Sequence, residues 1–215
     1  MTALLWRLEQ PYLFFRHYGK SLPAPGRLVL LVLALDLLAA WLLMPYLSVQ
    51  MAERFALNPT LDPAALPTAT WVATLFSALT PLLILLFVGF LMQLAILIFD
   101  GRVAFSALLS VLLWSSLPSL LVRLQCAIFY ATGWSADPTI SWTSLGYHWQ
   151  PQSDSSLSLA LSRLDLMEIL SFVLVLLGVR NISTLSGSTA WLVPLLIWGG
   201  LQLVYWRTLS STGSF

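Results

Sequence analysis

Four ionisable side chains stand within or at the edge of long apolar runs. They are Asp36, Arg123, Asp165 and Glu168. A charge at the centre of a membrane-spanning helix costs about 2.5–3.5 kcal/mol or more, so each of these groups needs a partner or a hydrated path. Carboxylates in such places bind cations, relay protons or neutralise a buried base. These residues are therefore the candidate functional groups of the chain.

The spacing of these groups predicts how they pair. Asp165 and Glu168 are three residues apart and share one helical face. At about 1.5 Å per residue from the basic residue that borders each run, Arg123 lies ~32 Å deep, Asp165 ~23 Å and Glu168 ~18 Å, but Asp36 only ~14 Å. We therefore predict that Arg123 reaches Asp165 or Glu168 and locks the third and fourth helices together. The same count predicts that Arg123 does not reach Asp36.

Asp36 then has no opposite charge at its own depth. Gln93, ~10 Å deep by the same count, is the nearest polar candidate. One interpretation is a neutral Asp36 hydrogen-bonded within the bundle. The alternative is a hydrated cavity around the carboxylate.

The elements that position these groups are apolar helices. Hydrophobic residues make up 59% of the 215 residues and charged residues only 9%, whereas soluble domains average about 25% charged. Together with a mean hydropathy of +0.86, this composition predicts an all-α polytopic membrane protein. The formal net charge of +1 argues against a nucleic-acid partner, because such binding needs many basic residues on one face.

No recognisable motif for enzymatic chemistry is present. His17 and His148 stand apart from any cluster with metal-ligand spacing, and Cys126, the only cysteine, lies in an apolar run. Phosphate-binding glycine loops, nucleophile elbows and zinc-protease motifs are all missing. We therefore expect no catalytic residues, no cofactor and no metal, and a protein that is not an enzyme.

Five apolar runs define the expected domain organisation. We predict a cytoplasmic interfacial segment at 1–26, a five-helix membrane domain at 27–208 and a short tail at 209–215. The expected spans are 27–49, 71–99, 103–131, 164–180 and 189–208. Prolines at 59, 63 and 67 predict an irregular loop over 50–70, and Pro81 predicts a kink in the second span or its effective start.

Basic residues near the spans predict the orientation. With the N-terminus inside, six of them lie on the cytoplasmic side and three on the other. This asymmetry predicts an N-in, C-out topology.

Two stretches resemble the Yip family of five-span membrane proteins. In the first, an acidic Asp165 opens an apolar run that closes on Gly178 and Arg180, followed by the Thr-Leu-Ser turn at 184–186. In the second, Asp-Gly-Arg at 100–102 precedes an aromatic residue and a Leu-Pro step at 117–118. The resemblance implies five spans with a cytoplasmic N-terminus.

The same resemblance bears on partners and location. Eukaryotic members carry a long cytoplasmic N-terminal domain, whereas only 26 residues precede the first span here, so a Rab-type GTPase is not the expected partner. The short chain is more similar to a member of the bacterial inner membrane.

Two functions follow as hypotheses. The first is an accessory or scaffold subunit that associates with another integral membrane protein, or with copies of itself, in transport or in envelope or membrane trafficking. The alternative is a small transporter or lipid-handling protein whose intramembrane carboxylates line a polar path.

Overall fold

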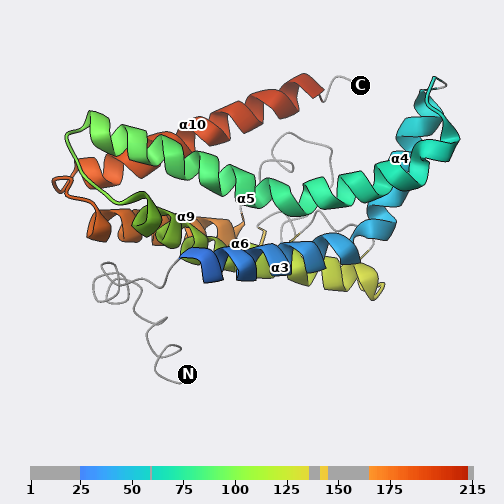
Figure 1. The fold of residues 1–215 in the computed structure, drawn as a ribbon, viewed down its shortest axis with the longest axis horizontal. Coiled ribbons are helices and arrows are strands. Elements are labelled where there is room, and N and C mark those ends of the chain that lie inside the picture. Colours follow the sequence, from blue (N-terminus) through green and yellow to red (C-terminus); the bar gives the residue numbers. More distant parts are fainter. Residues whose placement is uncertain (1–24, 59, 136–140, 145–164, 213–215) are drawn as a thin grey trace. The chain divides into compact units, whose positions relative to one another are not determined.

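The computed structural model describes residues 25–58, 60–135, 141–144 and 165–212, with side chains described up to Leu201 in the last range. Every regular element in these ranges is a helix (Figure 1). Outside the helices, the described backbone pairs as an isolated antiparallel bridge between Ser144 and Asp165. The predicted all-α fold class is confirmed for this part of the chain. Nearly all of segment 1–26, and most of the stretch between 132 and 163, lie outside it.

The helices follow the expected apolar runs with shifted ends. In chain order they are α3 (Pro25–Leu42), α4 (Met44–Leu57), the short 3-10 helix η1 (Pro63–Ala65), α5 (Leu66–Ile98), α6 (Phe105–Ala131), α9 (Leu166–Ile182) and α10 (Thr189–Thr212). Among the described residues, three stretches are long and apolar enough to cross a membrane, namely Pro25–Leu42, Pro63–Ile98 and Phe105–Ala131.

The prediction of an irregular loop over 50–70 is wrong for most of its length. Helix α4 continues to Leu57, and α5 begins at Leu66 rather than at 71. Pro63 and Pro67 do not break these helices, because each occupies the first turn of its helix, where its missing N–H has no intrahelical partner anyway. Asp62 caps η1 by accepting a 2.9 Å hydrogen bond from the Ala64 N–H.

Pro81 does not mark the start of the second apolar helix. Helix α5 contains 33 residues, begins fifteen positions earlier and runs through Pro81. A proline inside a helix leaves the carbonyl four residues before it without its helical donor. In α5 that carbonyl belongs to Ser77.

Contacts divide the chain into two compact units, which are described separately. Unit 1 comprises Met1–Leu28, Leu85–Ser115 and Ser171–Phe215, and unit 2 comprises Val29–Ile84 and Ser116–Leu170.

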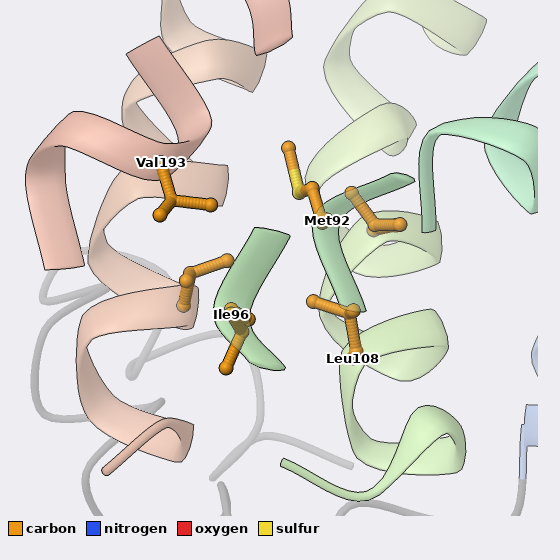
Figure 2. Close-up of a cluster of buried hydrophobic side chains, with 6 residues drawn as sticks. Met92, Ile96, Leu108 and Val193 are labelled. Carbon is orange, nitrogen blue, oxygen red and sulfur yellow. The ribbon is translucent and has the colours of Figure 1, made fainter. Parts of the chain in front are cut away.

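Four helices contribute large apolar side chains to the core of unit 1. The buried members are Met92, Ile96, Leu108, Leu112, Val179 and Val193. Figure 2 shows Met92 and Ile96 on α5 facing Leu108 on α6 and Val193 on α10. Near this core, α6 and α9 approach so closely at Gly178 that an added Cβ would overlap the Val111 side chain. Gly178 is therefore a packing residue.

The two turns of unit 1 join to each other at one end of the core. The Arg102 N–H donates to the Thr184 hydroxyl at 2.8 Å, and the Thr184 N–H donates back to the Arg102 carbonyl at 3.2 Å. An added Cβ at Gly101 would lie 2.5 Å from a methyl of Leu185. Asp100, at φ 57°, ends α5 in the left-handed conformation, which Asp adopts more readily than most residues. The turns at 100–102 and 184–186 thus contact each other directly.

Unit 2 is packed through small residues. Ala39 and Ala40 on α3, Ala78 on α5 and Ala127 on α6 are all fully buried. Small side chains allow helix backbones to approach closely, which is the usual packing mode of helices in membranes. The buried faces of α3, α5 and α6 also carry the charged and hydroxyl groups of the candidate site.

Candidate functional site

The side chain of Arg123 on α6 connects three helices of unit 2. Its Nη1 donates to Asp36 Oδ1 on α3 at 2.7 Å, forming an ion pair. Its Nη2 donates to the backbone carbonyl of Ser77 on α5 at 2.7 Å and to the Ser77 hydroxyl at 3.0 Å. The guanidinium group is therefore held by one carboxylate, one carbonyl and one hydroxyl.

The Ser77 carbonyl is available to Arg123 because of Pro81. In a regular helix this carbonyl would accept from the N–H four residues later, but Pro81 has no N–H. Within hydrocarbon, a polar backbone group left without a partner costs several kcal/mol. Arg123 supplies the missing donor at 2.7 Å. The carbonyl that Pro81 leaves without a helical donor thus accepts a hydrogen bond from Arg123, and the Arg123 guanidinium gains an acceptor.

Helical periodicity places these groups on facing surfaces. On α3, Val32, Asp36 and Ala40 are four residues apart and all are buried. On α5, Thr74 and Ala78 are buried beside the half-buried Ser77. The Asp36 side chain is 1% exposed, whereas that of Arg123 is 26% exposed. The ion pair therefore lies largely within the helix packing, with part of the guanidinium at its edge.

The prediction that Arg123 cannot reach Asp36 is wrong. The depth count assumed that every span begins at the same level. Asp36 is eleven residues into α3 and Arg123 is eighteen residues into α6, or ~16 Å and ~27 Å from their helix starts. Since the two side chains are in direct contact, α3 and α6 begin at different levels, and the long Arg123 side chain accounts for part of the remaining difference.

Asp165 has a local role instead of the predicted pairing with Arg123. Its Oδ1 accepts hydrogen bonds from the Met167 N–H and the Thr143 hydroxyl, both at 2.7 Å. Asp165 is thus the N-cap of α9, which satisfies one of the donors left free at a helix start. Glu168 lies exposed in the first turn of α9, where the helix dipole favours an acidic side chain. The expected lock between the third and fourth helices does not form through Arg123.

The remaining candidate, Gln93, is half-buried on α5 in unit 1. Asp36 takes Arg123 as its partner, not Gln93. The second oxygen of Asp36, Oδ2, is buried and has no hydrogen-bond partner among the described residues. Within the same residues, no group of three or more His, Cys, Asp or Glu side chains could hold a metal ion.

Sequence reasoning missed Ser77, Thr143 and the role of Pro81. One signal was available, because a proline in an apolar helix points to the residue four positions earlier as a free acceptor. In α5 the residue four positions before Pro81 is Ser77. Thr143 gave no comparable signal, since its contact with Asp165 depends on how the chain returns to α9.

No protein-family model, curated protein or solved structure matches the chain. Fold and site alone define its class. In its described part the chain is all-helical with three stretches suited to cross a membrane, and a half-buried arginine is paired with a carboxylate of the same chain.

The Asp36–Arg123 pair predicts a specific coupling between two neutral substitutions. Asp36→Asn or Arg123→Gln alone should lower the free energy of unfolding by about 2–5 kcal/mol, because each leaves an uncompensated buried charge. The double variant should lose clearly less than the sum of the two. The measurement is SDS-induced unfolding of the full chain in mild detergent, followed by circular dichroism. The control is the double variant Arg123→Gln with Asp165→Asn, whose two stability losses should add. The assignment is contradicted if the losses of Asp36→Asn and Arg123→Gln add, while those of Asp165→Asn and Arg123→Gln are coupled.

A second prediction concerns the proline and the arginine. In a Pro81→Ala background, Arg123→Gln should cost less stability than in the native chain, because the N–H of the introduced alanine then satisfies the Ser77 carbonyl. Pro194→Ala in α10, outside unit 2, is the matched background and should leave the cost of Arg123→Gln unchanged. The same detergent unfolding assay measures all six proteins, the three backgrounds each with and without Arg123→Gln. Equal costs in the Pro81→Ala and native backgrounds would rule out the shared carbonyl.

Proposed function

We propose that this chain is a non-enzymatic integral membrane protein of the Yip type that acts as an accessory or scaffold subunit for other membrane proteins. In this proposal, α9 and α10 complete a five-span domain with the N-terminus in the cytoplasm, and the protein resides in a bacterial inner membrane. The resemblance of the turn motifs at 100–102 and 184–186 and the distribution of basic residues support this placement.

The first support for a scaffold role is that charged side chains within the apolar helices hold structural contacts. Arg123 is neutralised by Asp36 and donates a hydrogen bond to the Ser77 carbonyl, and Asp165 caps a helix. A polar transport path requires carboxylates that are free to exchange ligands or protons. Asp36 and Asp165, which were expected to line such a path, hold structural contacts instead.

The second support, and the observation that carries the proposal, is the unburied surface of α5. Only 17% of its most apolar 18-residue window is buried, against 44% for the corresponding window of α6. Large aromatic side chains are among those exposed, including Phe87 at 55% and Phe90 at 58%. An exposed apolar side chain of a membrane helix faces either lipid or another protein, and aromatic residues are enriched in protein interfaces. We infer that this face of α5 contacts another membrane protein or a second copy of the chain.

Native-level purification tests this proposal. The full chain, tagged at its own expression level and purified in mild detergent, should retain one membrane protein in fixed stoichiometry or should run as a defined oligomer. Phe87→Ala with Phe90→Ala should remove at least half of the retained partner. Leu121→Ala with Ile128→Ala removes exposed apolar groups from α6 instead and should leave retention unchanged. A monomer without a stoichiometric partner would refute the scaffold role, and equal losses from both pairs would refute the α5 interface.

A further inference from the structure

A shallow apolar groove runs between α5 and α10 in unit 1. It is mostly open, with a volume of about 360 Å³, and its lining includes Leu91, Leu94 and Ile98 from α5 and Leu196, Gly200 and Leu201 from α10. The α5 side begins at Ile98, the last residue of that helix, and reaches back seven residues to Leu91, a length of ~10 Å. Gly200 lines the groove, and a Cβ added there would meet nothing within 4 Å, so a larger side chain has room at this position.

Two arginines lie near the joined turns of unit 1, beyond the end of α5 that carries the groove residue Ile98. Arg102 follows α5 by four residues and Arg180 belongs to the last turn of α9, and both are exposed. The backbone of Arg102 is fixed by its two hydrogen bonds with Thr184. The Arg180 guanidinium lies 5.0 Å from the centre of the Trp191 ring, a cation–π contact that holds it beside the start of α10.

Neither guanidinium has a carboxylate partner in the described part of the chain, where the one ion pair joins Arg123 to Asp36. Asp100 is the exposed acid in the same turn as Arg102. Two arginines against one aspartate leave an excess of one positive charge at this end. An anion is therefore the ligand whose charge complements the joined turns.

The exposed apolar residues show at which level that anion would lie. Ile98 and Phe99 are 70% and 42% exposed, and Arg102 follows Phe99 by only three residues. In a bilayer, hydrocarbon covers such apolar side chains, and basic residues just beyond them lie among the headgroups. The anion at that level is lipid phosphate, which guanidinium groups bind through charge-assisted hydrogen bonds.

We propose that unit 1 binds an anionic phospholipid, with its phosphate on Arg102 and Arg180 and one acyl chain in the α5–α10 groove. The groove alone would accept any acyl chain, and the arginines alone would accept any phosphate. Their combination selects a lipid with both parts and a net negative charge. The inference rests on the membrane placement proposed above. The groove residues of α5 follow Phe87 and Phe90 at helical spacing, so this lipid would adjoin the proposed partner on α5.

Native mass spectrometry of the full chain in detergent micelles tests this site, with phosphatidylglycerol and phosphatidylcholine of identical acyl chains as probes. The first bound phosphatidylglycerol should have an affinity at least about fivefold above that of phosphatidylcholine, as one net basic charge near an anionic headgroup implies. Arg102→Gln with Arg180→Gln should bring the two affinities within twofold. Arg54→Gln, an exposed arginine of α4, is the control and should change neither.

The groove is tested by a matched pair of glycines. Gly200→Leu should fill the groove and weaken binding of both lipids several-fold, whereas Gly199→Leu, at the neighbouring open position, should leave binding intact. Soluble glycerol phosphate should not displace the lipid, because it lacks the acyl chain. Equal affinity for the two lipids in the native chain, or equal effects of the two glycine variants, would overturn the site. These outcomes do not depend on whether a partner protein copurifies.

Discussion

A half-buried arginine is the constraint on which unit 2 depends. A guanidinium group is always charged and carries five donors, and within hydrocarbon it is stable only where acceptors are already in place. Arg123 obtains them from two other helices, Asp36 on α3 and Ser77 on α5. Because the acceptors come from different helices, the ion pair specifies which faces of α3, α5 and α6 meet. The small residues that surround it allow the helix backbones to come close enough for these contacts.

Pro81 extends this constraint to the backbone of α5. A proline in an apolar helix creates an acceptor at a defined position, and a nearby arginine needs one. Each feature is costly by itself, whereas together they leave the Ser77 carbonyl and one Arg123 nitrogen satisfied. Asp36 Oδ2 still contributes an unfavourable free energy, since it is buried without a hydrogen-bond partner among the described residues. The pairing thus accounts for a proline and an arginine that otherwise look like defects in apolar helices.

Composition and hydropathy were sufficient to predict the all-helical class, because a chain with 9% charged residues has few other ways to satisfy its backbone in an apolar environment. They also singled out Asp36 and Arg123 as important. They could not predict that these two form the pair. That prediction required the relative level of α3 and α6 along their axes. This level depends on how the helix faces pack together, and it cannot be obtained by counting residues from a chosen edge.

The turns of unit 1 illustrate a different limit. Asp-Gly-Arg at 100–102 and Thr-Leu-Ser at 184–186 were recognisable as turns from their residue types, but nothing in either motif indicates that it contacts the other. The reciprocal hydrogen bonds between Arg102 and Thr184 join segments 82 residues apart. Such long-range backbone contacts depend on the packing of the four helices between which the turns lie. They place Arg102 and Arg180 at the same end of unit 1.

The most direct test of the central claim is a distance measurement on Arg123 in a lipid bilayer. Solid-state NMR of the full chain, with ¹⁵N in the arginine guanidinium groups and ¹³C in the aspartate carboxyl groups, detects pairs in direct hydrogen-bond contact. The contact at 2.7 Å between Arg123 Nη1 and Asp36 Oδ1 predicts a strong dipolar coupling that disappears in Asp36→Asn and persists in Asp165→Asn. A coupling that survives Asp36→Asn and disappears in Asp165→Asn would show that the arginine pairs elsewhere.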